Sequence, residues 1–184
     1  MIDYDDISLM HEINNGNRGA FDVLVRRHSQ YFFAIIYRFV NNRDLAEDLL
    51  QTAFLKLWER PFKFNPDAGA GFKTWFARVT VNLCLDDRRA RRPCACLDDM
   101  EIADTRPDAP ELIDRGRRIA ALNAGICKLP SDMRTAITLG WIQDMKYAEV
   151  GKIMNKNENT VKVIISRAKE KLKQYMQENG YDGI

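Results

Sequence analysis

The stretch that most constrains this chain is its C-terminal run over residues 145–172, MKYAEVGKIMNKNENTVKVIISRAKEKL. Apolar residues in the second half recur at helical spacing: Val161, Ile165, Ala168 and Leu172. This periodicity predicts an amphipathic helix whose other faces carry cations. Asn157 can cap that helix, because its side-chain oxygen can accept a hydrogen bond from a free backbone N–H. A short helix, a polar turn and a cationic second helix are typical of a helix-turn-helix, which places its second helix in the major groove of DNA.

Length and composition exclude several other classes of protein. At 184 residues and 46% hydrophobic content, the chain fits one globular domain or two small ones. It contains no run of 18 apolar residues, so we expect no membrane insertion. The first ten residues are acidic and then apolar, which is unlike a secretory signal. We therefore expect a cytoplasmic protein whose four cysteines are thiols.

Charge is distributed unevenly along the chain. Residues 1–93 carry 14 Lys+Arg and 12 Asp+Glu, a net charge of +2. Residues 94–113 carry one arginine and six acids, a net charge of −5, whereas residues 114–178 carry 13 Lys+Arg and seven acids, a net charge of +6. Two basic blocks that flank an acidic connector indicate two lobes that face nucleic acid and a segment that DNA repels.

The order of periodic segments and breakers predicts an all-α fold with two small helical domains. We expect helices over 20–40, 44–60, from Thr74 to about Ala90, 111–126, and from Ser131 to Trp141, followed by the helix-turn-helix. Residues 61–73 read as a loop. The predicted domains are 1–93 and 114–178, joined by a flexible acidic linker over 94–113 and followed by a tail over 179–184.

Four blocks, in order, carry a resemblance to a known family. They are DLAEDLLQ at 44–51, GFKTWFARVTVN at 71–82, Leu129-Pro130 followed by Arg134, and YAEVG at 147–151 with TVK at 160–162 and SRA at 166–168. This arrangement resembles the group 4, or extracytoplasmic-function, sigma factors of bacterial RNA polymerase, over residues 18–175. The blocks are similar to that family's D-A-E-D-L-x-Q, F-x-x-W-L-x-R-I-x-x-N, opening of region 4, and Y-x-E-I-A with T-V-K-S-R-x-x-R-A.

The chain departs from the family pattern at a few positions in its C-terminal block. Gly151 replaces a usual alanine, and glycine within a helix costs about 1 kcal/mol relative to alanine. Lys146 stands where serine is common, so the first helix of the pair lacks a good cap. Val163 and Ile164 replace serine and arginine, so Val163 can make only apolar contacts with bases.

The resemblance implies a subunit that binds core RNA polymerase and reads promoter DNA. A polar ridge at i, i+3, i+4 and i+7 would, from its spacing alone, be a solvated helix face. In the family this helix docks on the clamp helices of the largest polymerase subunit. The residues that we expect to bind core polymerase are Asp44, Glu47, Asp48, Gln51, Leu55 and Trp58.

The segment over 62–82 mixes aromatic residues, glycines and cations, as a site for a base leaving the duplex requires. Phe72, Trp75 and Phe76 could equally be core; we expect Trp75 and Val79 to pack inward. The residues expected to recognise and melt the −10 element are Phe64, Asn65, Gly71, Phe72, Lys73, Arg78, Asn82, Arg88 and Arg89.

Exposed positions of the second helix of the helix-turn-helix are candidates for reading the −35 element. Arginine can grip guanine with two hydrogen bonds, which makes Arg167 the strongest of them. The set is Asn159, Thr160, Lys162, Val163, Ser166 and Arg167.

Cysteine and histidine usage indicates no metal and no cofactor. Cys94 and Cys96 supply two thiols, whereas a zinc site needs four ligands, and a reactive thiol pair in the linker is the remaining interpretation. We expect Cys84 and Cys127 to be buried and His28, after two arginines, to lie at the surface. No catalytic constellation is present in the sequence, so we expect no enzymatic activity.

Two lobes on a linker suit the distance between promoter elements. The −10 and −35 elements lie roughly 80 Å apart, and the 20 linker residues can span about 65–70 Å. Without polymerase, the lobes are expected to pack together and hide their DNA faces, a state that an anti-sigma factor would stabilise. The alternatives are a sigma-like decoy that binds an anti-sigma protein and a stand-alone helix-turn-helix repressor.

Overall fold

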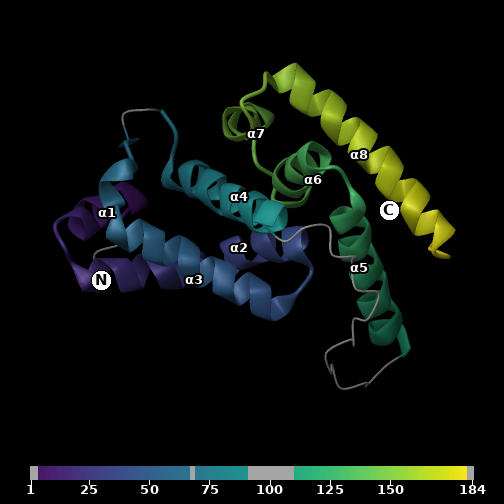
Figure 1. Ribbon diagram of the computed structural model, residues 1–184, viewed down its shortest axis with the longest axis horizontal. Helices are drawn as coiled ribbons and strands as arrows, with labels where there is room; N and C mark the ends of the chain where they lie inside the picture. Colours follow the sequence, from purple (N-terminus) through teal and green to yellow (C-terminus); the bar gives the residue numbers. More distant parts are fainter. Residues whose placement is uncertain (1–3, 67–68, 91–109, 182–184) are drawn as a thin grey trace.

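The computed structural model describes residues 4–66, 69–90 and 110–181, and this part of the chain contains helices and no strand, so the all-α prediction is confirmed (Figure 1). The elements are α1 (Asp6–Asn14), α2 (Arg18–Val40), α3 (Arg43–Glu59), the 3₁₀ turn η1 (Pro61–Lys63), α4 (Phe72–Ala90), α5 (Pro110–Lys128), α6 (Ser131–Ile137), the π-helical turn η3 (Thr138–Ile142), α7 (Tyr147–Met154) and α8 (Glu158–Glu178). Within the described ranges, no helix combines the length and the apolar character that crossing a membrane requires.

The N-terminal lobe, α1 to α4, is built around aromatic rings. Phe32 of α2 and Phe76 of α4 are fully buried, with ring centroids 4.7 Å apart in an edge-to-face arrangement. Phe54 of α3 completes the contact at 5.0 Å from Phe76. Such pairs add about 0.5–1.5 kcal/mol beyond the area that they bury, so the three long helices are joined at their centre by ring packing.

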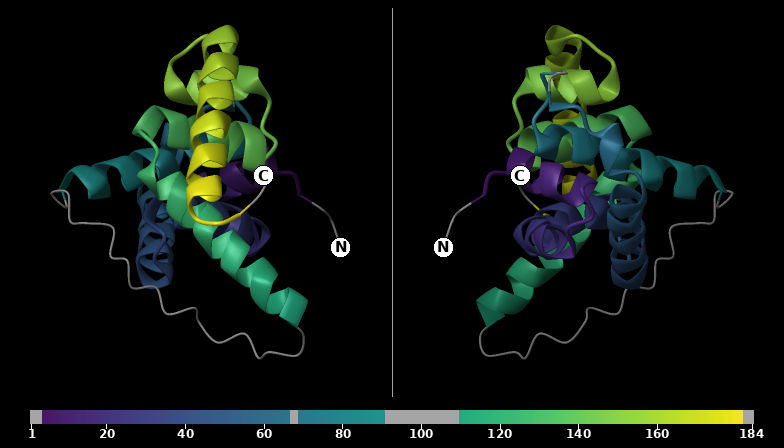
Figure 2. Two further views of the ribbon diagram at one scale, coloured as in Figure 1. Left: turned by 90° about the vertical axis from the view of Figure 1, so that its right-hand side faces the viewer. Right: turned by 90° about the vertical axis from the view of Figure 1, so that its left-hand side faces the viewer.

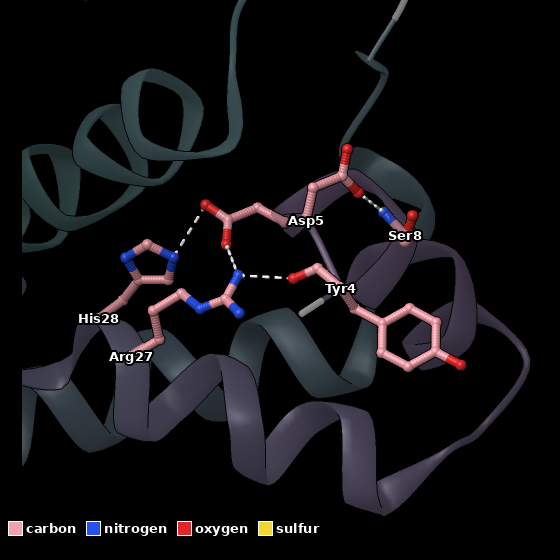
Figure 3. Close-up of polar contacts among 6 residues, drawn as sticks. Tyr4, Asp5, Ser8, Arg27 and His28 are labelled. Carbon is pink, nitrogen blue, oxygen red and sulfur yellow. Dashed lines mark hydrogen bonds and ion pairs between the residues drawn. The ribbon is translucent and has the colours of Figure 1, made fainter. Parts of the chain in front are cut away.

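The first helix was not predicted, and it corrects the expectation for His28. Asp5 caps α1 by accepting a hydrogen bond from the Ser8 backbone N–H at 2.8 Å, and its bonds to Ser8 lower the pKa of its carboxyl group. Asp6 pairs with two residues of α2, with Arg27 and with His28 Nε2, each at 2.9 Å. Figure 3 shows the side chains of Arg27 and His28 near the start of α1. His28 is only 2% exposed, so its predicted surface position is wrong.

The C-terminal lobe, α5 to α8, has an aliphatic core. Ile126, Ile137 and Leu172 are fully buried within it. Two glycines permit close packing: a Cβ on Gly125 would lie 2.5 Å from the Tyr175 ring, and one on Gly140 would lie 2.7 Å from Ile165. The helix that we predicted to continue from Ser131 to Trp141 is α-helical only to Ile137 and then widens into η3.

The two lobes are in direct contact, and Arg134 of α6 is central to that contact. Its guanidinium is buried and donates to the carbonyl oxygens of Ile126, Cys127 and Leu129 at the end of α5. It also donates to Phe39 O at the end of α2, at 2.9 Å. Helix C-termini carry partial negative charge and free carbonyls, so one cation satisfies the ends of a helix in each lobe. The N-terminal part of α5 projects beyond the packed helices (Figure 2).

Candidate nucleic-acid interface

The turn between α7 and α8 is as tight as the sequence predicted. Asn155 ends α7 in the left-handed region at φ 55°, and the Lys156 N–H donates to Gly151 O at 2.9 Å. A Cβ on Gly151 would lie 2.6 Å from Lys156 O, so the turn requires glycine at this position. Asn157 accepts a hydrogen bond from the Thr160 N–H at 2.7 Å, which confirms it as the cap of α8.

Helix α8 separates an apolar stripe from an exposed polar face. The four residues of the predicted stripe are buried, and Met176 extends the stripe. Among the expected −35 residues, those that are exposed are Asn159, Lys162, Val163 (49% exposed), Ser166 and Arg167. Thr160 is half-buried and its hydroxyl donates to Asn157, so the structure places it in the helix cap. Ile164 packs against the core and faces away from the exposed set.

Two lysines of α8 already have partners within the chain. Lys162 Nζ lies 2.8 Å from Glu158 Oε1, one turn earlier, in an exposed ion pair. Lys169 Nζ lies 4.6 Å from the centre of the Trp141 ring, a cation–π contact. Exposed ion pairs contribute about 0–1 kcal/mol, so Lys162 can exchange its carboxylate for a phosphate at little cost.

The first helix of the pair has a cap that the sequence reasoning missed. Lys146 offers no side-chain acceptor at the start of α7. Instead, the carboxylate of Glu149 accepts a hydrogen bond from the Lys146 backbone N–H at 3.3 Å, which is half of a capping box. The acid three residues after the start of the helix was the available signal in the sequence.

Helix α4 exposes several cations and an amide. Arg78, Asn82, Arg88 and Arg89 are exposed, as are Lys73 at its start and Asn65 and Gly71 in the preceding loop. Arg89 pairs with Asp86 at 2.9 Å, and both side chains are largely in solvent. The packing of the lobes leaves Arg78, Asn82, Arg88 and Arg89 exposed, as it does the α8 set, so the expectation that closed lobes hide their DNA faces is wrong for these side chains. Helix α7 does contact the loop before α4 and the first turn of α4.

Two aromatic residues of this segment are more deeply buried than expected. Phe64 and Phe72 are only 8% and 2% exposed, whereas Trp75 and Val79, which we expected to pack inward, are half-buried and pack against the core. Phe72 stacks on Phe76 at 5.4 Å, and its ring also contacts that of the buried His28 at 5.1 Å. In this structure, Phe64 and Phe72 pack into the core next to the loop, and neither presents a ring face to solvent.

The start of α4 also differs from the prediction. The helix was expected to begin at Thr74, but α4 begins at Phe72, and Thr74 is buried in its first turn. Its hydroxyl donates to Glu149 Oε1 of α7 at 3.1 Å.

The polar ridge of α3 is exposed beside an apolar hollow. Asp44, Glu47, Asp48 and Gln51 are all exposed, and Leu55 is 53% exposed. Trp58 is half-buried, with its ring 5.2 Å from that of Phe21. A hollow of about 320 Å³ lies between α2 and α3. It is lined by Glu47 and Gln51 of the ridge and by apolar side chains that include Val25, Leu50 and Phe54.

The cysteines of the described ranges sit at the junction of the lobes. Cys84 of α4 is buried as predicted, and burial, reinforced by the charge of Asp87, raises the pKa of its thiol to about 12. Cys127 is half-buried, with its sulfur 3.5 Å from Arg38 O. Cys94 and Cys96 lie outside the described residues. No group of three or more His, Cys, Asp or Glu side chains suited to a metal ion occurs among the residues that the structure covers.

Two family models match the chain, and together they cover both lobes. Sigma-70 region 2 matches residues 24–93, and Sigma-70 region 4 matches residues 119–172. A likeness to solved structures gives the fold. The structure of CnrH in complex with the cytosolic domain of CnrY has a TM-score of 0.70 at 24% identity, over 94% of this chain and 97% of that one. The sigma factor RpoE from Bartonella quintana, in complex with the anti-sigma factor NepR, has a TM-score of 0.67 at 20% identity, over 85% and 96%.

Relatives of known identity extend the match over most of the sequence. The chain is 31% identical to the ECF RNA polymerase sigma factor SigE of Mycolicibacterium smegmatis over 85% of its own length, and it spans 62% of the length of that relative. It is 29% identical to the ECF RNA polymerase sigma factor SigW of Bacillus subtilis, over 91% of this chain and 94% of that protein. The chain therefore belongs to the sigma-70 family of RNA polymerase sigma factors, within its extracytoplasmic-function group.

Proposed function

We propose that this protein binds core RNA polymerase, directs it to specific promoters and helps to open the DNA for transcription initiation. The observation that carries the proposal is the presence of three separate exposed surfaces on one all-α chain. They are the acidic ridge of α3, the cationic face of α4 and the cationic face of α8. A repressor needs only the last of these, whereas a sigma factor needs all three.

The three surfaces divide the work between the predicted domains. Residues 1–93 would bind polymerase through the α3 ridge, with Leu55 and Trp58 beside it, and would hold the −10 strand along α4. Arginines on the clamp helices would pair with the ridge carboxylates. Residues 114–178 would read the −35 element through α8, with the linker over 94–113 setting the distance between the two.

The contacts of α8 sort into positioning and reading. Lysine binds phosphate without sequence information, so Lys162 would position the helix. Arg167 would read a guanine, and Val163 a thymine methyl group. Phosphate contacts release counterions, so promoter binding should weaken steeply with salt, by a logarithmic slope of about −0.9 per phosphate on duplex DNA.

A partner that stabilises the closed arrangement is part of the proposal. The lobes are in contact through Arg134, and promoter elements roughly 80 Å apart require them to separate. A protein that binds the closed form more tightly would hold the chain inactive. The similar fold of RpoE from Bartonella quintana was solved with its anti-sigma factor, which supports a partner of that kind. We also propose that the chain acts in the cytoplasm and performs no catalysis of its own.

In vitro transcription tests the proposal directly. Purified core polymerase would be incubated with a pooled promoter library, with and without this protein. Initiation from a defined subset of promoters, which yields their −10 and −35 sequences together, is the expected result. Binding to polymerase without initiation would favour a decoy, and binding to DNA without polymerase would favour a repressor. A variant with the ridge changed to Asp44→Asn, Glu47→Gln and Asp48→Asn should lose polymerase binding while keeping its fold.

A further inference from the structure

The helix-turn-helix contacts the N-terminal lobe at the very loop and first turn assigned above to the −10 strand. Thr74 Oγ1 donates to Glu149 Oε1 of α7 at 3.1 Å. Lys152 of α7 donates from Nζ to the carbonyl oxygen of Gly69 at 2.9 Å. Two polar side chains of α7, one turn apart, therefore contact the beginning of α4 and the loop before it.

A tyrosine of α2 belongs to the same surface. Lys73 Nζ lies 5.4 Å from the centre of the Tyr31 ring, and that ring is half-buried. Burial, and to a smaller degree the negative charge of Glu149, raises the pKa of the Tyr31 hydroxyl. A cation, an aromatic ring and a hydroxyl group are thus gathered near one carboxylate that the other lobe supplies.

This combination has a recognisable chemistry. Proteins that bind single-stranded nucleic acid join cations, which attract the phosphates, to aromatic rings on which bases stack. Lys73 and Tyr31 are such a pair, and Lys73 is already a candidate for the −10 strand. A carboxylate fixed beside them repels phosphate, and its helix α7 lies against the loop and the first turn of α4.

We propose that the surface of Tyr31, Gly69, Lys73 and Thr74 binds either α7 or the displaced −10 strand, and that Tyr31 is an additional contact for that strand. Glu149 and Lys152 hold the surface closed. The inference rests on the proposed function, because it assumes that α4 meets a melted strand. It adds that the helix-turn-helix competes with DNA at a place distant from its own recognition face.

The proposed competition predicts that one substitution, Lys152→Met, tightens DNA binding even though it removes a positive charge. When only the open form can bind, the apparent affinity is reduced by the fraction of molecules that are open. Lys152→Met removes a hydrogen bond that closes the surface, but it also removes a positive charge, which by itself would weaken DNA binding. Tighter binding of DNA by this variant could therefore not come from general electrostatics.

The experiment uses the full chain and a fluorescein-labelled oligothymidine strand at low salt, with the dissociation constant read from anisotropy. Lys152→Met should bind the strand roughly twofold to tenfold more tightly than the wild type, the range expected for one hydrogen bond. Small-angle scattering should show a larger radius of gyration for the same variant. The matched control is Lys156→Met, since Lys156 pairs with Asp132 inside the C-terminal lobe, at 3.3 Å. This control should bind no more tightly than the wild type.

Two further variants separate the strand contact from the closure. Tyr31→Leu should weaken strand binding about fivefold or more, as loss of a stacking platform does. Tyr37→Leu, whose ring stacks on Phe33, should leave it unchanged. Equal strand affinity and equal radius of gyration in the wild type and Lys152→Met would overturn the inference. Because oligothymidine needs neither polymerase nor a promoter, that failure is distinct from a failure to initiate transcription.

Discussion

Helices α4 and α8 are both proposed to face DNA, yet they are built differently. Helix α8 buries a single apolar stripe and leaves its opposite face free of other elements. Helix α4 buries an aromatic face in its own lobe, and its first turn also holds α7 of the other lobe through Thr74. A helix that packs within one lobe along one stripe can be interpreted from its periodicity. A helix that also packs against the other lobe cannot, because its burial no longer follows one stripe.

The largest effect on stability should come from substitution of Phe72, which tests whether this ring belongs to the core or contacts the DNA strand. Phe72→Ala should lower the free energy of unfolding by about 3–5 kcal/mol, because it removes a fully packed ring. Urea unfolding followed by circular dichroism measures this. Val23→Ala, at an exposed position of α2, is the control and should change stability by less than about 0.5 kcal/mol. Unchanged stability with lost promoter opening would instead make Phe72 a base contact.

Arg134 tests whether the lobes share one stabilising group. Arg134→Met should cost about 3 kcal/mol, because four carbonyl oxygens lose a buried charged donor. The loss should appear in unfolding measured by fluorescence and by circular dichroism alike. Arg115→Met, at an exposed position of α5, should be nearly neutral. A cost below about 1 kcal/mol would mean that water replaces the guanidinium.

Substitution of Arg167 tests whether the exposed face of α8 reads the bases of the promoter. Arg167→Ala should reduce initiation from the preferred promoters roughly fivefold to 150-fold, the equivalent of about 1–3 kcal/mol, with unfolding unchanged. Arg167→Lys keeps the charge but loses the two-pronged contact, and it should not restore the preference. If lysine restores full initiation, Arg167 contacts phosphate and the reading role passes to its neighbours.

Substitution of two glycines by alanine should change the stability of the protein in opposite directions. Gly151→Ala should destabilise the protein by about 1 kcal/mol or more, because its Cβ would lie 2.6 Å from a backbone oxygen. Gly116→Ala, with no atom within 4 Å of its Cβ, should stabilise the protein by about 0.4–1 kcal/mol. Thermal melting compares the two variants, and stabilisation by both would show that the turn can relax.

The smallest effect at neutral pH concerns Cys84. Its folded pKa of about 12 lies above the usual value of about 8.5, so its neutral form stabilises the fold below pH 8.5, and this contribution is lost as pH rises toward 12. At pH 8 its thiol should be almost entirely protonated, and alkylation should be negligible. In a variant with serine at positions 94 and 96, the half-buried Cys127 should react first. Faster reaction of Cys84 would indicate that the junction of the lobes opens.

The sequence predicted those features that depend on local spacing. The buried stripe of α8, the Asn157 cap and the helical class are confirmed because each follows from periodicity or from one side chain. His28 was misplaced because its partner Asp6 is 22 residues away, on a helix that was not predicted. The role of Arg134 was also inaccessible, since its acceptors lie on two other helices. Which of the exposed residues touch polymerase or DNA stays a prediction.

The π-helical turn at Thr138–Ile142 has a consequence for how this fold tolerates change. There the Gln143 N–H bonds to Thr138 O, five residues back, at 3.0 Å, so the turn accommodates one residue more than an α-helical turn. Each residue of an α-helix advances the phase by about 100°. Deleting one residue here would restore a regular spiral but rotate everything downstream by about that angle. The extra residue thus sets the rotation of α7 and α8 relative to α5 and α6. Insertions or deletions at this turn should therefore be far more damaging than their small size suggests.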